Sequence, residues 1–153
     1  MSDDVSIREA RLEDAPVLVD FQIRMARSTE ELELDPPTVT RGVAAVFADP
    51  AKGTYWVAES AGRVIGSLLT TFEWSDWRNG TVLWIQSVYV LPEWRRRGIY
   101  KRLYEHLKRR VEKSPDLRGL RLYVDLRNTA AQEVYERLGM TQEHYRMYEW
   151  LKG

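Results

Sequence analysis

Residues 86–103, with the sequence QSVYVLPEWRRRGIYKRL, decide the interpretation of this 153-residue chain. The first six residues are mostly β-branched, aromatic or aliphatic and are followed by Pro92, which is typical of a strand and its end. Three consecutive arginines and Gly98 come next, and from Ile99 onward apolar residues recur four apart, which predicts a helix. The first N–H groups of a helix lack intrahelical partners and lie at the positive end of its dipole. The stretch therefore predicts a strand, a basic turn and a helix start that binds a phosphate or pyrophosphate.

The predicted phosphate site combines this basic turn with the first helical residues. Gly98 would let the backbone approach the anion closely. Taken alone, the basic run is about equally typical of a solvated face beside a helix cap, and its place between strand and helix favours anion binding. The residues expected at the site are Arg95, Arg96, Arg97, Gly98, Ile99, Tyr100 and Lys101.

Hydrophobic periodicity in the rest of the chain predicts one mixed domain over residues 1–153, in the order β-α-α-β-β-β-α-β-α-β. We expect an α/β (α+β) fold in which helices flank a mixed, mainly antiparallel sheet, with an Asn-Gly hairpin at Asn79. The predicted strands are 5–10, 54–59, 64–74, 81–91, 120–124 and 144–150. The predicted helices start at Asp14, at about residue 39, at Gly98 and at Asn128, and residues 29–37 are expected to form a loop between the first two.

Composition excludes several kinds of chemistry. The chain has no cysteine and two histidines, so we expect no disulfide, no thiolate nucleophile and no metal site. No apolar run is long enough to span a membrane, and the acidic start does not resemble a signal peptide, so a soluble cytoplasmic protein is expected. Nine basic residues lie between Arg95 and Lys113, but the whole chain has 23 basic and 23 acidic residues, which argues against a nucleic-acid partner.

The balanced total charge hides an asymmetry along the chain. Residues 1–76 hold 14 acidic and seven basic side chains, whereas residues 77–153 hold nine acidic and 16 basic ones. An anionic ligand in the second half and a cationic one near the first half would fit this division. Solvated loop charges are the simpler explanation for each carboxylate taken singly. The candidates to bind a cationic acceptor are Glu30, Glu31, Glu33, Asp35 and Glu73, with Trp74 as part of an aromatic wall.

Two spaced motifs resemble the GNAT superfamily of acetyl-CoA-dependent N-acetyltransferases. Its first signature is Arg or Gln, two residues, Gly, one residue, then Gly or Ala, and the segment from Arg95 to Ile99 matches it. Tyr100 stands where the second small residue is usual, and it must project away from the cofactor. The second signature is similar to residues 128–140, with Asn128, Tyr135 and Gly139 at the expected places. The likeness covers nearly the whole chain.

The resemblance implies roles for individual residues. The strand before the phosphate loop would separate from its neighbour, so that the backbone of Val88, Tyr89 and Val90 pairs with the pantetheine arm of acetyl-CoA. The N–H near Val88 would face the thioester carbonyl. Asn128 would position the cofactor arm, although an ordinary N-cap explains it as well. Tyr135 would protonate the departing sulfur, whereas its helical spacing alone favours a core tyrosine.

The resemblance leaves the general base and the acceptor open. Gln86 lies where several family members have a glutamate, and an amide cannot accept the proton, although it can hold a water or orient the amine. The function expected is direct acetyl transfer to a primary amine of a small cationic acceptor. Transfer to a protein lysine or N-terminal amine, or acyl-CoA binding without catalysis, are the alternatives. A homodimer is possible, since aromatic residues of segment 144–150 suit either an interface or the core.

Overall fold

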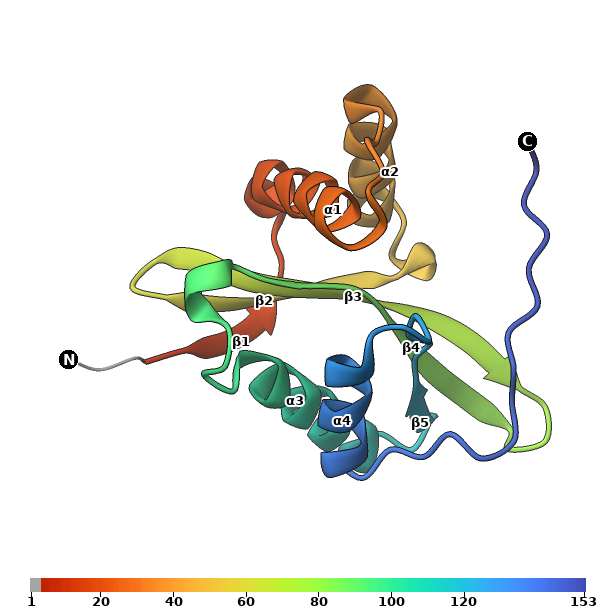
Figure 1. Ribbon diagram of the computed structural model, residues 1–153. Helices are drawn as coiled ribbons and strands as arrows, with labels where there is room; N and C mark the ends of the chain where they lie inside the picture. Colours follow the sequence, from red (N-terminus) through yellow and green to blue (C-terminus); the bar gives the residue numbers. More distant parts are fainter. Residues whose placement is uncertain (1–3) are drawn as a thin grey trace. The chain divides into compact units, whose positions relative to one another are not determined.

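The computed structural model describes residues 4–153. Its first compact unit, which ends at Arg121, is built around a five-stranded mixed sheet. Its strands follow the sequence in space, from β1 to β5 (Figure 1). Strands β1 to β4 pair antiparallel with their neighbours, and β5 pairs parallel with β4. The prediction of a mixed, mainly antiparallel sheet is therefore confirmed. The strands are β1 (Ser6–Glu9), β2 (Thr54–Ser60), β3 (Arg63–Ser75), β4 (Gly80–Val90) and β5 (Leu117–Arg121).

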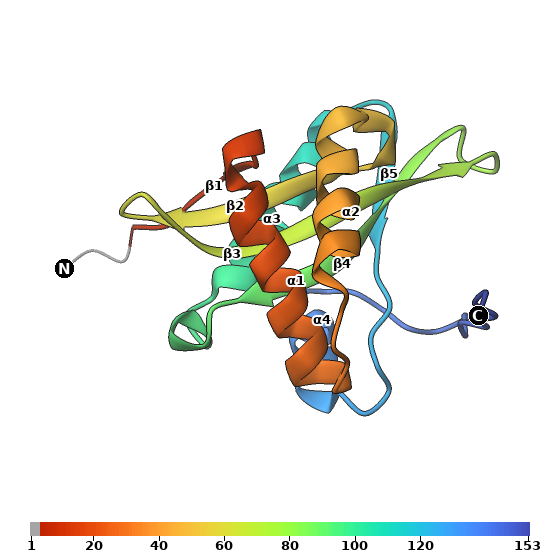
Figure 2. The same ribbon diagram turned by 90° about the horizontal axis from the view of Figure 1, so that it is seen from above.

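Helices cover both faces of this sheet. Helices α1 (Ala15–Glu30) and α2 (Pro36–Ala48) lie side by side on one face, and α3 (Ile99–Lys113) lies on the other (Figures 1 and 2). Leu18 of α1 and Val43 of α2 pack against the strands in one buried cluster. On the other face, Leu103 and Leu107 of α3 are fully buried, as the four-residue spacing predicts. Short 3-10 turns at Leu12–Asp14, Pro50–Lys52 and Pro92–Trp94 connect these elements.

The connection between α1 and α2 is shorter than the sequence predicts. Helix α1 continues to Glu30 and ends at Glu31, whose φ of 52° is left-handed, as is common at a helix end. The two prolines start α2 instead of preceding it, because a proline in the first turn has no N–H that needs a helical partner. The carboxylate of Asp35 caps α2 by accepting a hydrogen bond from the Thr38 N–H at 3.1 Å.

The last strand of the sheet is also shifted from its prediction. The expected strand at 120–124 is instead β5 (Leu117–Arg121), because pairing with β4 begins at Leu117 and ends where Arg121 faces Trp84. Alternation of apolar residues continues to Val124, but a strand extends only as far as its hydrogen-bonding neighbour.

Residues 122–153 form a second compact unit with a single helix, α4 (Thr129–Arg137). Asn128 caps it by accepting a hydrogen bond from the Ala131 N–H at 3.1 Å, and Gly139 follows its end with a left-handed φ of 92°. The strand predicted at 144–150 is wrong: these residues have no regular secondary structure. Their alternating pattern is typical of a strand, but no strand pairs with them among the described residues, and Tyr148 and Trp150 are exposed. In the part of the chain described, no helix is long and apolar enough to cross a membrane.

Candidate active site

Strand β4 contains a bulge beside the predicted cofactor edge. Ser67 of β3 faces Tyr89, but Leu69 faces Gln86, so Ser87 and Val88 together lie opposite Leu68. Ser87 takes a left-handed φ of 55°, which serine rarely adopts. A bulge leaves its extra residue outside the hydrogen-bond ladder. Neither Ser87 nor Val88 therefore has a register partner on β3.

On its other side, β4 already loses its neighbour before the bulge. Strand β5 pairs with β4 only from Thr81 to Trp84, and no described strand of this unit pairs with β4 farther along that edge. Near the end of β4 the Leu91 N–H donates to the Ile65 carbonyl oxygen of β3 at 2.9 Å. Successive residues of a strand direct their backbone groups to opposite sides, so the backbone of Val90 faces away from β3. No described strand of this unit therefore engages the outward backbone groups at the end of β4.

The turn after β4 has the backbone features that suit an anion site. Arg96 and Gly98 both have left-handed backbones, with φ of 62° and 74°, and such turns direct successive N–H groups into one concavity. Helix α3 starts directly after Gly98, and no side chain caps its first N–H groups. Its first intrahelical bond runs from the Arg102 N–H to the Gly98 carbonyl oxygen, at 3.1 Å. The turn therefore combines backbone N–H groups, the positive end of the helix dipole and exposed arginines.

The arginines of the turn make different contacts. Arg95 donates from Nε to the carbonyl oxygen of Val90 at 3.0 Å, and its guanidinium lies 5.5 Å from the centre of the Tyr89 ring. Arg97 stacks over Trp94 at 4.9 Å. Arg95 therefore ties the turn to the open edge of β4, and Arg97 is ordered against the preceding 3-10 turn.

Tyr100 is accommodated along the helix. Its half-buried ring lies 6.4 Å from that of Tyr104, one turn further along α3. The large residue in place of the motif's small one thus packs beside a helix neighbour.

Polar side chains form a row on the sheet face that α1 and α2 share. Gln86 donates from Nε2 to the Thr71 hydroxyl at 2.7 Å. Farther along, the carboxylate of Glu73 accepts hydrogen bonds from Trp84 Nε1 at 3.1 Å and from Arg121 at 2.6 Å. These two bonds hold the pKa of Glu73 below its usual value, first through the indole N–H and then through the guanidinium. Glu73 is thus a stable carboxylate and a weak base.

Register places Glu73 at a distance from the bulge. It faces Val82, five residues before Ser87 on β4. At about 3.3 Å per residue this separation is roughly 17 Å. Glu73 therefore lies toward the far end of the row, and Gln86 is the member beside the bulge.

The other residues predicted to bind the acceptor differ in whether the protein already engages them. Glu33 forms an ion pair with Arg27 at 2.8 Å, and Asp35 caps α2. Glu30 and Glu31 are exposed, and neither forms an ion pair within the described chain. Trp74 follows Glu73 directly, so the alternation of β3 directs it to the opposite face, where its exposure is 64%. Trp84 is the tryptophan that contacts Glu73.

The two predicted residues of the second unit are both on or beside α4. Asn128 is its N-cap, as the simpler interpretation proposed. Tyr135 is half-buried, and burial raises the pKa of its hydroxyl, which therefore keeps its proton at neutral pH. Among residues 4–153, no group of His, Cys, Asp or Glu side chains is arranged to hold a metal ion.

A family model described as the Acetyltransferase (GNAT) family matches residues 18–140. Among solved structures, a possible acetyltransferase from Clostridium difficile 630 is 42% identical, with 97% of each chain covered and a TM-score of 0.91. No curated protein matches significantly.

Two more distant structures resemble the chain in fold. A predicted acetyltransferase from Clostridium acetobutylicum, solved with acetyl-CoA, is 20% identical, covers 97% of this chain and 95% of its own, and has a TM-score of 0.74. AAC(6')-Iy, in complex with the bisubstrate analog CoA-S-monomethyl-acetylneamine, is 16% identical, with 98% and 99% coverage and a TM-score of 0.76. At this identity the likeness extends to the fold alone.

Proposed function

Because the chain belongs to the GNAT family of acetyltransferases, we propose that it transfers the acetyl group of acetyl-CoA directly to a primary amine of a small cationic acceptor. The observation that carries the proposal is the combination of the Ser87 bulge, the open edge of β4 and the left-handed basic turn before α3. The absence of cysteine supports direct transfer, since no protein thiol is available to carry the acetyl group.

Acetyl-CoA fits the residues present on two counts. The backbone of Val88 and the N–H of Val90, which face away from β3, are proposed to pair with an extended arm, and the turn offers N–H groups and arginines for a pyrophosphate. When bound, acetyl-CoA would supply a thioester, whose acetyl group is activated toward an amine and whose thiol is the leaving group. The residues proposed to hold it are Val88, Tyr89, Val90, Arg95, Arg96, Arg97, Gly98, Ile99, Tyr100, Lys101, Asn128 and Tyr135.

Three groups of the chain are proposed to act in the reaction. The N–H of Val88 donates a hydrogen bond to a carbonyl oxygen as that oxygen gains negative charge. The hydroxyl of Tyr135 is proposed to donate a proton to the leaving group; burial raises its pKa, which keeps the proton in place at neutral pH but makes the hydroxyl a weaker acid. Gln86 orients the amine or a water through its amide, which the hydrogen bond to Thr71 fixes in place. Because Gln86 is not a base, the acceptor amine enters neutral or loses its proton to water.

The charge of the acceptor is proposed from the carboxylates that remain available. Glu30 and Glu31, at the end of α1, are exposed and have no cationic partner in the described chain. Glu33, Asp35 and Glu73 are already engaged by Arg27, Thr38 and Arg121. Glu30 and Glu31 are therefore proposed as the main attraction for a cationic acceptor.

A thiol-release assay with acetyl-CoA tests the proposal across small polyamines, aminoglycosides, lysine peptides and N-terminal peptides. Turnover should be highest with a small cationic amine. Preference for peptides would instead support a protein acetyltransferase, and saturable CoA binding without turnover on any amine would support a binding domain. The structure of AAC(6')-Iy with a bisubstrate analog supports an enzyme over a binding domain, because it shows that a protein of this fold can hold such an analog.

The acceptor charge has its own test. The double variant Glu30→Gln/Glu31→Gln should raise the acceptor KM severalfold at low salt and leave the KM for acetyl-CoA nearly unchanged. Glu112→Gln, which removes an exposed carboxylate from α3, is the matched control. Equal acceptor KM values in the double variant and the control would contradict a role for these two residues.

A further inference from the structure

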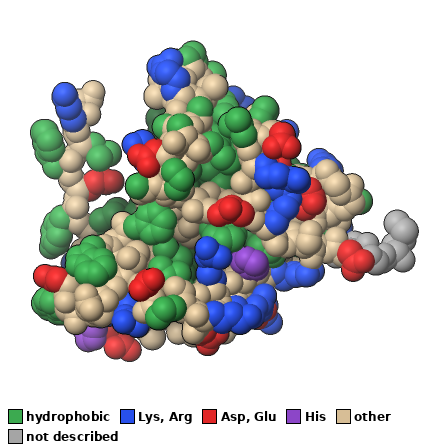
Figure 3. All heavy atoms as spheres, turned by 180° about the vertical axis from the view of Figure 1, so that it is seen from behind, with side chains coloured by type: hydrophobic (Ala, Val, Ile, Leu, Met, Phe, Trp, Pro, Cys, Tyr) green, Lys and Arg blue, Asp and Glu red, His purple; other side chains and the backbone are tan. Residues whose placement is uncertain are grey.

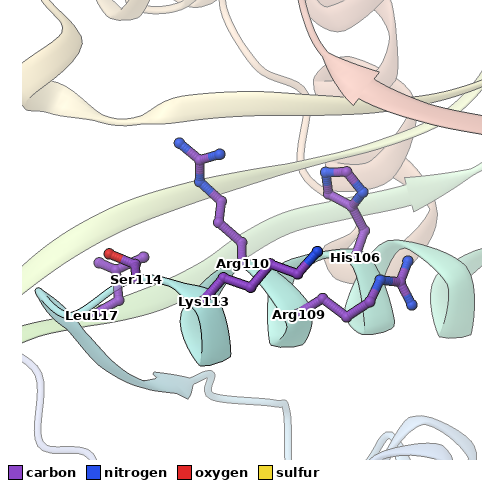
Figure 4. Close-up of a pocket in the computed structure, with 6 residues that line it drawn as sticks. All are labelled: His106, Arg109, Arg110, Lys113, Ser114 and Leu117. Carbon is purple, nitrogen blue, oxygen red and sulfur yellow. The ribbon is translucent and has the colours of Figure 1, made fainter.

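A cavity of about 440 Å³ lies along the C-terminal half of α3, on the first unit (Figure 4). The side chains that line it are His106, Arg109, Arg110, Lys113, Ser114 and Leu117. Positions 106, 109, 110 and 113 share one side of a helix because they are three or four residues apart. On the face shown in Figure 3, Lys and Arg side chains gather beside a histidine. The proposed acetyl transfer uses none of these residues.

A buried tryptophan holds two of the lining residues in place. The ring of Trp56, on β2, lies 5.4 Å from the His106 ring, and the Arg110 guanidinium lies over it at 5.2 Å. Trp56 is itself fixed, because its Nε1 donates to the buried Thr70 hydroxyl at 3.0 Å. Figure 4 shows His106 and Arg110 extending from the same side of α3. Two nitrogen-bearing side chains are thus pre-positioned by the core, which lowers the entropy cost of binding.

The positive charge of the cavity is not neutralised by the protein. No carboxylate forms an ion pair with Arg109, Arg110 or Lys113 in the described part of the chain. The pKa of His106 is lowered by burial and by the nearby guanidiniums of Arg109 and Arg110, which agrees with a positive local potential.

Asp116 lies between the lining residues Ser114 and Leu117, but it forms no ion pair with Arg109, Arg110 or Lys113 in the described part of the chain. At 100° per residue, Glu105 and Glu112 lie on another side of α3. Glu9 of β1, the cross-strand neighbour of Trp56, is the carboxylate that the sheet register brings to this face.

We propose that this cavity binds a small anion with two or more phosphate groups. Two guanidiniums, one ammonium and one imidazole on a single helix face suit a row of phosphate oxygens, and guanidiniums bind such oxygens with paired hydrogen bonds. Basic residues in the last turn of a helix also stabilise the negative end of its dipole, which accounts for Arg110 and Lys113 but not for a concavity that also includes His106 and Arg109.

The cavity is separate from the proposed CoA site. Arg110 is 12 residues from Gly98 along α3, which is roughly 18 Å at 1.5 Å per residue. The two ends of the helix also differ in kind. At the N-terminal end, backbone N–H groups face an anion, whereas at this end only side chains can bind one, because the backbone carbonyls carry partial negative charge.

Titration of the full chain with inorganic tripolyphosphate tests the proposal by calorimetry and by the NMR signals of the two histidine rings. Binding should saturate and should shift the signal of His106 but not that of His144. Arg109→Ala/Arg110→Ala should weaken binding at least about tenfold, as expected for lost charge-assisted hydrogen bonds. Glu9→Gln, which removes the acidic neighbour, should strengthen it.

Two controls make the result specific. Lys108→Ala removes an exposed cation from the opposite side of α3, and Arg96→Ala removes one from the proposed CoA turn. Neither should change the effect of tripolyphosphate on His106. Arg110→Lys keeps the positive charge and replaces the double alanine variant if that variant is unstable. It should retain part of the affinity for tripolyphosphate. Unchanged affinity in the double variant, or binding lost only with Arg96→Ala, would overturn the proposal.

Discussion

Arg95 donates from Nε to the backbone carbonyl oxygen of Val90 at 3.0 Å, and this bond joins the basic turn to the open edge of β4. The same guanidinium lies 5.5 Å from the centre of the Tyr89 ring. Arg95 thus positions the turn, whereas Arg96, exposed on a left-handed backbone, is available to a phosphate. Two adjacent arginines of one motif are therefore expected to contribute to cofactor binding by different means.

This difference predicts distinct salt dependences. Arg96→Ala should weaken CoA binding about tenfold at low salt, and the loss should shrink as salt rises, because a charge interaction with phosphate is screened. Arg95→Ala should weaken binding by a similar factor at every salt concentration, since it removes a positioning hydrogen bond. Calorimetric titration with CoA at two ionic strengths measures both effects. The same salt dependence in the two variants would contradict the assignment.

The left-handed backbone of Ser87 predicts which substitutions the bulge tolerates. Ser87→Gly should preserve both stability and activity, because glycine adopts a positive φ without cost. Ser87→Val should destabilise the fold by about 1–2 kcal/mol and lower kcat/KM for acetyl-CoA, because a β-branched residue is strained there. Ala61→Val, at φ 50° in the turn between β2 and β3, is the strain control and should destabilise the fold without affecting kcat/KM. Chemical denaturation and steady-state kinetics measure the two effects.

Gly98 can be tested in the same way, with Gly62 as its strain control. It has a φ of 74° and open space where a Cβ would stand, and Gly62 has a φ of 77° with equally open space. Valine at either position should therefore cost about 1–2 kcal/mol in unfolding free energy, through backbone strain. Only Gly98→Val should also weaken CoA binding, because its side chain would enter the open space before α3 where the pyrophosphate is proposed to bind. Equal CoA affinities in the two variants would remove Gly98 from the cofactor site.

The sequence predicted the parts of this site that depend on residue type and spacing. The arginines, Gly98 and the four-residue apolar repeat of α3 carry their own signals, and the structure has a strand, turn and helix start in that order. The bulge at Ser87 and the left-handed backbone of Arg96 carried no signal in the sequence, because neither residue type indicates a positive φ. Such conformations are imposed by the surrounding sheet and turn, and only glycine or asparagine would have indicated them.

Pairs across strands were predictable only in part. Alternation along β3 separates Glu73 from Trp74, so their assignment to one acceptor wall conflicted with a rule available from the sequence. The contact of Glu73 with Trp84 requires the hairpin register, in which Ser75 faces Gly80. The contact of Arg121 with Glu73 could not be predicted, because β5 follows α3 in the sequence and its pairing with β4 depends on the tertiary fold. Residues 144–150 show the converse, because a strand pattern without a pairing partner forms no strand.

The bonds of Glu73 predict how stability depends on pH. Trp84 and Arg121 lower its pKa in the folded state, so its contribution is present above the ordinary glutamate pKa and is lost as pH falls through the lower, folded value. The unfolding free energy of the wild type should therefore decrease as pH is lowered below about 4.5. Glu73→Gln should reduce that decrease, and Glu30→Gln, which removes a carboxylate without an ion pair, should not. Urea denaturation at several acidic pH values gives the slopes, and identical slopes for Glu73→Gln and the wild type would contradict the prediction.

Tyr135 offers the most direct test of the proposed proton transfer. Burial raises the pKa of its hydroxyl, so the group is protonated at neutral pH and available as an acid. Tyr135→Phe keeps the half-buried ring and removes only that hydroxyl. Proton transfer by a positioned side chain is worth about 10²–10⁴-fold in rate, although a thiolate with a pKa near 8.5 leaves partly unaided, so we expect a loss of kcat of about 10²-fold.

The comparison variant for this experiment is Tyr148→Phe, in which the altered ring is 90% exposed and lies outside α4. Both variants should retain the CoA affinity and melting temperature of the wild type, and only Tyr135→Phe should lose kcat. The measurement needs conditions in which chemistry limits turnover, since slow product release would mask the effect. If Tyr135→Phe then turns over at the wild-type rate, Tyr135 is a packing residue of α4, and water protonates the leaving sulfur.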